Sequence, residues 1–206
     1  KNEKAITWVL FNDYIQWFNK ETSSTINEVI AKDMLTNRFN LMKKDENEGL
    51  EFIHKTLRDY FAAVYMKNNN KFSPDEIFKL VHADSTKNND LVNALRLFVG
   101  IIKPEAIKEI IKKFIEKDLY LSCELFAWSS INVFEEEFIN KMVEKIDINS
   151  REYLLNLNEV VLFYLKVLDL IKKSGRYNEP IFADYLQTLG IAYDDKGDYI
   201  QANELY

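Results

Sequence analysis

Glycine and proline are scarce in this sequence: five glycines and three prolines stand in 206 residues. All-β folds place these residues at many turns, so their scarcity argues against a sandwich or barrel and favours a mainly helical chain. The single cysteine, Cys123, cannot form an internal disulfide, and with only two histidines beside it there is no structural zinc set. We therefore expect a helical protein without a metal site, in a reducing cytoplasmic setting.

Long apolar runs and an excess of positive charge are also missing. No segment approaches the roughly 18 consecutive apolar residues of a membrane span, and the first residues carry charges instead of a signal peptide. Lysine and arginine number 27 against 33 acidic residues, which gives a net charge of −6. The balance disfavours unspecific attraction to nucleic acid or anionic lipid, so we expect neither kind of partner.

Catalytic motifs are absent as well. A phosphate-binding loop needs glycine followed by lysine, and none of the five glycines has that neighbour. No serine lies in a glycine-flanked elbow. The acidic run Glu135–Glu137 is interpreted as favourable charge at a helix start, and Cys123 as a buried apolar residue. We expect no catalytic residue in this sequence.

The first part of the chain predicts two helices and a hairpin. Apolar residues recur at helical spacing over 5–20, and a second helix, with N-caps offered by Ser23–Thr25, fades near Asn37. The period then changes to alternation on both sides of the polar run 44–49, with Phe39, Leu41 and Lys43 before it and Leu50, Phe52 and His54 after it. Two helices followed by a small hairpin are the outline of a winged helix.

From residue 55 onward we predict helices only. The first, over 55–67, has an apolar side of Leu57, Tyr60, Phe61, Val64 and Tyr65. The others cover 74–82, 90–102, 104–117, 119–130, 134–146, 152–173, 180–195 and 199 onward, with Pro74, Pro104 and Pro180 at helix starts. Ile107, Ile110, Ile111, Phe114 and Ile115 form a regular apolar stripe, and Trp8, Trp17 and Trp128 occupy positions expected to pack in the core. Short consecutive helices predict stacked antiparallel pairs, as in an α-solenoid.

One motif carries a family resemblance. In the segment 50–65, Phe52, His54, Asp59, Tyr60, Phe61, Ala62 and Ala63 resemble the end of the winged helix in NACHT-type STAND nucleoside triphosphatases, and residues 89–130 look like the helical segment that follows it. In that family a strand-end histidine contacts the β-phosphate of ADP and holds the closed, inactive state. The resemblance implies this cofactor-binding role for His54, and an imidazole N–H is a suitable donor to phosphate. The alternative is a structural histidine bonded to the backbone at a strand end.

A second motif lies near the end of the chain. Leu186, Leu189, Gly190, Tyr193, Gly197, Tyr199, Ala202 and Tyr206 resemble a truncated tetratricopeptide repeat. In such a repeat, small residues lie where two helices touch and large ones fill the gaps between them. Because at least three repeats are normally needed for stability, we expect more of them beyond Tyr206.

Together these resemblances imply a domain order: a winged helix with its exit helix over 1–70, a helical domain over 71–150, and a helical linker with the first repeat over 151–206. They imply the regulatory middle of a longer, ATP-hydrolysing switch in antiphage or innate immune defence. ATP or ADP with Mg²⁺ would bind mostly upstream, and this segment itself would not be an enzyme. Its partners would be a protein ligand on the repeats and further copies of itself on activation. The alternative is a helical-repeat scaffold that binds proteins without a nucleotide switch.

Overall fold

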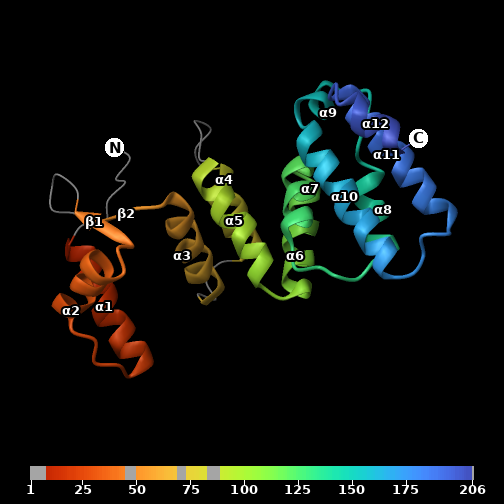
Figure 1. Ribbon diagram of the computed structural model, residues 1–206. Coiled ribbons are helices and arrows are strands. Elements are labelled where there is room, and N and C mark those ends of the chain that lie inside the picture. The colour runs from red at the N-terminus through yellow and green to blue at the C-terminus, as the bar shows by residue number, and fades with distance from the viewer. Residues whose placement is uncertain (1–7, 45–49, 69–72, 83–88, 206) are drawn as a thin grey trace. The chain divides into compact units, whose positions relative to one another are not determined.

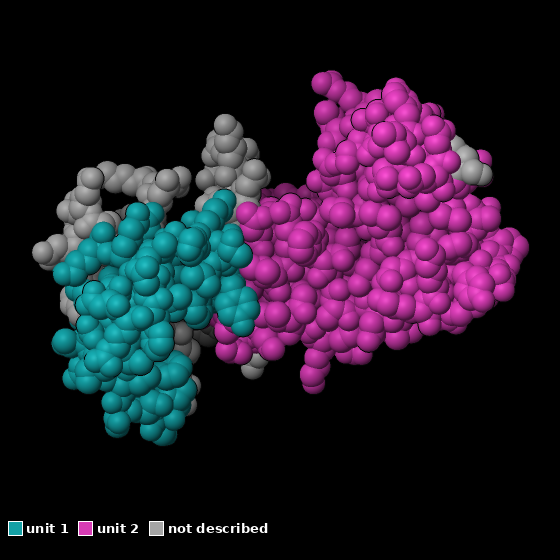
Figure 2. All heavy atoms as spheres, viewed as in Figure 1, with its two compact units in different colours: residues 1–62 teal, residues 63–206 magenta. Residues whose placement is uncertain are grey.

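The computed structural model describes residues 8–44, 50–68, 73–82 and 89–205, and within them the protein is mainly helical, as predicted (Figure 1). One antiparallel hairpin and one π-helical stretch accompany twelve α-helices in this described part. The chain divides into two compact units, residues 1–62 and 63–206 (Figure 2). The helix α3 (Lys55–Asn68) contains the division between them.

The first unit begins with α1 (Trp8–Thr22) and α2 (Glu28–Asp33). The predicted caps Ser23–Thr25 do not start α2; its N-cap is Asn27, whose Oδ1 accepts the N–H groups of Val29 and Ile30 at 2.9 and 3.2 Å. The reason lies in α1, where the side chain of Asn19 bonds both the N–H and the carbonyl of Ile26, each at 2.8 Å. These bonds hold Ile26 against α1 with its N–H and carbonyl both engaged, so the helix begins later than predicted.

A short π-helix, η1 (Met34–Arg38), continues α2 and leads into the hairpin. Asn40 has a left-handed backbone, with φ of 51°, and turns the chain toward β1 (Met42–Lys44). This strand pairs with β2 (Leu50–Phe52), Met42 opposite Phe52. The predicted hairpin is therefore present but shorter: Phe39 lies before the turn, 58% exposed, and His54 lies after the strand.

The core of the first unit combines both helices with both strands. Phe11 and Ile15 of α1, Ala31 of α2, Met42 and Leu50 are buried together, and Leu35, Leu41 and Phe52 pack against them. Met42 and Leu50 lie on the same face of the hairpin, since Lys44 is opposite Leu50 and Met42 is two residues earlier. The side chains of Trp8 and Trp17, predicted to pack in the core, lie outside the described residues.

The second unit contains two rows of helices. The first row comprises α4 (Pro74–His82), α6 (Pro104–Ile115), α8 (Glu136–Val143) and α11 (Pro180–Asp195). The second row comprises α5 (Asn89–Ile101), α7 (Leu119–Trp128) and α10 (Leu157–Lys173). A five-residue helix, α9 (Arg151–Leu155), precedes α10, and α12 (Tyr199–Leu205) packs on α11. All three prolines stand at the first residue of a first-row helix, as predicted.

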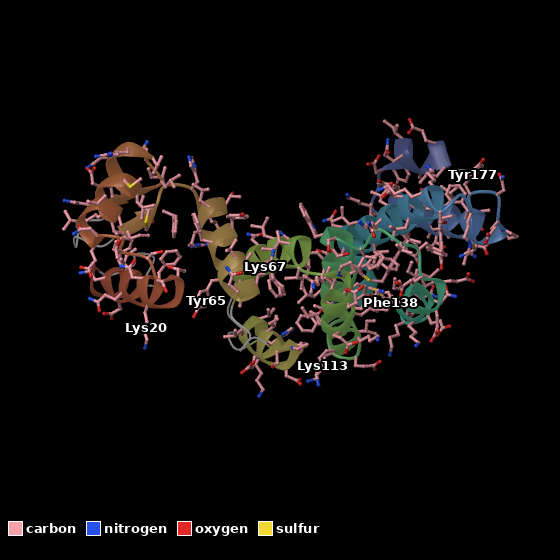
Figure 3. All side chains as sticks on the ribbon, turned by 90° about the horizontal axis from the view of Figure 1, so that it is seen from below. Lys20, Tyr65, Lys67, Lys113, Phe138 and Tyr177 are labelled. Carbon is pink, nitrogen blue, oxygen red and sulfur yellow. The ribbon has the colours of Figure 1, made fainter. Side chains whose placement is uncertain are left out.

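Ion pairs and polar contacts connect neighbouring helices of the first row. Lys113 of α6, labelled in Figure 3, pairs with Asp75 of α4 at 2.7 Å. Between α6 and α8 the pairs are Lys108 with Glu135 and Glu116 with Lys145; between α8 and α11, Asn140 meets Tyr185. Further contacts give the direction: Phe78 and His82 of α4 meet Lys117 and Asp118, and Glu136 at the start of α8 meets Arg176 just before α11. Because the residue numbers rise together in each pair of segments, neighbouring first-row helices run parallel.

The core of the second unit surrounds the second-row helix α7, which contacts α5, α6 and α10. Every residue of α7 from Tyr120 to Phe126 is buried, and Phe126 packs against Phe163 of α10 at 5.4 Å between ring centroids. Toward α5, the N–H of Ser130 donates to the carbonyl of Val99. The predicted stripe of α6 closes this core, because Ile107, Ile110, Ile111, Phe114 and Ile115 are all buried, as expected.

Three details of the prediction are wrong. The helix expected over 152–173 is broken at Asn156, whose side-chain N–H donates to the carbonyl of Glu152 and competes with helix continuation. Trp128 is not a core residue: it is the last residue of α7 and is 51% exposed. In α3 the buried residues are Asp59, Ala63 and Met66, at helical spacing, while Tyr60, Phe61 and Tyr65 are more than 40% exposed.

Two glycines end consecutive long helices in the same way. Gly175 and Gly197 have φ of 76° and 82°, a conformation that glycine adopts without strain. The N–H groups of Gly175 and Arg176 return to carbonyls of α10, and those of Gly197 and Asp198 return to carbonyls of α11. Both ends are Schellman motifs, which make the sharp reversals between α10, α11 and α12 possible.

The stacked core predicts the stability effect of a substitution in α6. Ile111→Ala should lower the free energy of unfolding by about 2–5 kcal/mol, because Ile111 is fully buried and its removal leaves a cavity. Ile200→Ala, the same change at a residue of α12 that is 74% exposed, is the matched control and should change it by less than about 0.5 kcal/mol. Urea denaturation followed by circular dichroism measures both; equal effects would contradict the assigned core.

Candidate functional site

The predicted cofactor residue, His54, lies at the junction between β2 and α3. The N–H of Ile53 still donates to the carbonyl of Leu41 on the neighbouring strand, at 3.0 Å. The carbonyl of His54 already accepts from Leu57 and Arg58 at the start of α3, at 3.0 and 3.4 Å. His54 is therefore the residue at which the hydrogen-bond pattern changes from strand to helix, as the motif requires.

The side chain of His54 points into solvent. It is exposed, and within the described residues its imidazole has no hydrogen bond or ion pair. The alternative of a ring bonded to the backbone is not found among these residues. An imidazole without a protein partner keeps both ring nitrogens available to a ligand.

The other motif residues divide into a buried and an exposed set. Asp59 is only 4% exposed, and its Oδ1 accepts from Nε and Nη2 of Arg58 at 3.1 and 3.0 Å. Phe61 is partly exposed and stacks on Phe52 with ring centroids 5.5 Å apart. The Arg58–Asp59 pair lies within α3, while the stacking of Phe61 on Phe52 connects α3 with β2 on the other side of His54.

Sequence reasoning missed one buried ion pair. Glu124 of α7 is 6% exposed and pairs with Arg96 of α5. Burial raises the pKa of the Glu124 carboxyl, and the Arg96 guanidinium partly offsets this effect. The sequence offered one signal of this pair, because Glu124 is the single charged residue in the apolar segment that forms α7. The pair connects two second-row helices.

The remaining candidate groups have structural roles. Glu135, Glu136 and Glu137 pair with Lys108, Arg176 and Lys141. Cys123 is fully buried, as predicted, and burial raises the pKa of its thiol. The described residues contain no group of three or more metal-ligating side chains. No helix among them is both long and apolar enough to cross a membrane.

Comparison with known proteins finds no match to a family model, a curated protein sequence or a solved structure. The functional assignment therefore depends on the motif and on the geometry of the junction.

The exposed imidazole predicts that His54 contributes nothing to folding. His54→Ala should leave the free energy of unfolding within about 0.5 kcal/mol of the parent chain. Asp59→Ala should lower it by about 1–3 kcal/mol, because the buried acceptor of Arg58 is lost. Chemical denaturation of both variants checks this. A strongly destabilised His54→Ala chain would mean that the ring has a structural partner.

Burial of Cys123 predicts an inert thiol. The thiolate is the reactive form, and both the raised pKa and the surrounding side chains keep it scarce and inaccessible. Iodoacetamide at pH 8 should leave the folded chain unmodified and label it completely in guanidinium chloride, as read by mass spectrometry. Rapid labelling of the folded chain would contradict the central position of α7.

Proposed function

We propose that this chain is the regulatory and sensor-linking segment of a NACHT-type STAND ATPase switch. Residues 8–54 have the order of elements expected of a winged helix: two helices, then a short hairpin. The observation that carries the proposal is the junction after that hairpin, where His54 is exposed and its imidazole has no partner among the described residues. A histidine so placed is able to donate to a ligand without breaking any bond of the fold.

In the proposed mechanism His54 donates an imidazole N–H to the β-phosphate of ADP, which a nucleotide domain elsewhere in the same protein binds with Mg²⁺. The contact exists only in the closed state, so it favours that state by its own free energy. A charge-assisted hydrogen bond of this kind is worth roughly 1.5–3 kcal/mol. A protein ligand that binds the open state more tightly would reverse the preference and allow oligomerisation.

The sensor role is proposed for the last helices of the second unit. Gly190 and Ala202 are buried, as the tetratricopeptide pattern requires where two helices touch, and Gly197 makes the turn between α11 and α12. Tyr199 departs from the pattern because it is 64% exposed and fills no gap between helices. Tyr206 lies outside the described residues. Antiphage or innate immune defence in the cytoplasm is the proposed setting.

A second candidate function is a protein-binding scaffold without a nucleotide switch. The two rows of stacked helices favour it, since such arrays bind other proteins through extended surfaces. In this alternative His54 is an ordinary surface residue. The two proposals differ in one respect that can be measured: whether a nucleotide is held with the help of His54.

The test is the nucleotide content of the full-length protein that contains this chain. We expect the purified protein to release stoichiometric ADP on denaturation, and His54→Ala to release much less, because the closed state loses its phosphate contact. His82→Ala is the matched control: it removes the other histidine, which lies in the second unit and pairs with Asp118 at 2.9 Å. It should retain ADP as the parent does.

Two outcomes would overturn the assignment. Equal ADP in all three proteins would make His54 a surface residue without a role in the switch. No nucleotide in any of them would favour the scaffold.

A further inference from the structure

The chain bends at the junction that carries His54, between the hairpin and α3. The N–H of Ile53 bonds the carbonyl of Leu41, just before β1, and the carbonyl of His54 accepts the N–H groups of Leu57 and Arg58 in α3. Between these two sets of bonds lie the backbone rotations of Ile53 and His54, two for each residue. The backbone bonds therefore hold the hairpin and the helix separately and do not by themselves fix the angle between them.

One aromatic contact crosses this junction. The ring of Phe61, in the second turn of α3, stacks on the ring of Phe52 of β2, with centroids 5.5 Å apart and an angle of 25° between the planes. Both residues belong to the first unit, and Phe52 packs against the buried core of that unit. Because the two rings lie on opposite sides of His54 in the chain, their contact holds α3 at one angle to the hairpin.

The ring of Phe61 is held in place without being part of the core. It is 43% exposed, and its neighbour Tyr60 meets it edge-on with ring centroids 5.8 Å apart. The buried residues of α3 are Asp59, Ala63 and Met66. Loss of the Phe61 ring thus removes the contact across the junction while these buried residues stay in place.

We propose that Phe61 is a positioning residue for His54: its stack on Phe52 fixes the bend at the junction, and thereby the direction in which the imidazole extends. This inference rests on the proposed function, in which His54 donates to a β-phosphate. A hydrogen bond needs its donor and acceptor within about 2.7–3.2 Å, so a changed bend carries the imidazole out of reach of a phosphate that another domain holds. Phe61 acts on the nucleotide only through His54.

The effect on the junction is measured on the 206-residue chain by ¹⁵N relaxation of the His54 and Lys55 amides. We expect order parameters of about 0.85 in the parent chain and below about 0.6 in Phe61→Ala, because the bend then varies on the nanosecond timescale. Phe61→Tyr keeps the ring and should behave as the parent chain does. Phe39→Ala is the matched control: it removes the same ring from a residue of the first unit that is 58% exposed, and both amides should stay rigid. Circular dichroism establishes that the variants are folded.

The effect on the nucleotide is measured on the full-length protein by titration calorimetry with ADP and with AMP. Phe61→Ala should weaken ADP binding about threefold to tenfold and leave AMP binding unchanged, because AMP has no β-phosphate. Phe61→Tyr should restore ADP binding, and Phe39→Ala should not alter it. In a protein that already carries His54→Ala, Phe61→Ala should have no further effect, since the contact through which it acts is gone.

Four results would refute the inference. Unchanged order parameters at His54 in Phe61→Ala would show that the stack does not fix the bend. Normal ADP binding in Phe61→Ala, together with weak binding in His54→Ala, would exclude the positioning role and leave the proposed function intact. Equal loss of ADP and AMP binding, or a further loss in the double variant, would show an effect that does not pass through His54. No effect of His54→Ala itself on ADP binding would refute the proposed function, and this inference with it.

Discussion

The burial of α7 is the constraint on which the second unit depends. This helix contacts α5, α6 and α10, and its neighbours are arranged so that each covers one of its sides. The helices that surround α7 are amphipathic, but α7 has apolar residues all round, and such a helix is stable only when it is enclosed. The two parallel rows follow from this requirement. Ion pairs between first-row helices fix the spacing at the rim, where charges stay hydrated and contribute little stability.

Sequence periodicity predicted the buried face correctly for some helices and wrongly for others. The stripe of α6 could be read directly, because every apolar residue of the stripe is also a buried one. The face of α3 could not: aromatic side chains suggested one side, while the buried side holds Asp59, whose burial depends on the neighbouring Arg58. The prediction that Trp128 packs in the core was wrong for a related reason: the residue lies at the end of α7, and this position leaves its side chain exposed. The hydrophobicity of a segment does not reveal which of its residues are covered by other helices.

The sequence predicted where the candidate site lies, but not whether the His54 ring has a hydrogen-bond partner. The motif located the change from strand to helix at His54, and the hydrogen bonds of its backbone agree. Whether its ring is bonded or open to solvent depends on which groups surround the junction, and sequence spacing does not contain that information. The left-handed turn at Asn40 and the cap at Asn27 were missed for a similar reason. The start at Asn27 depends on the side chain of Asn19, which bonds Ile26 seven residues away. The turn at Asn40 depends on backbone bonds from Phe39 and Leu41 to Met34 and Leu35.

The central claim is that His54 contacts a β-phosphate, and titration calorimetry of the full-length protein with ADP and with AMP tests it most directly. AMP has the same base, sugar and α-phosphate but no β-phosphate. We predict that His54→Ala weakens ADP binding by about tenfold or more and leaves AMP binding unchanged. Equal effects on both nucleotides, or no effect on ADP, would contradict the account.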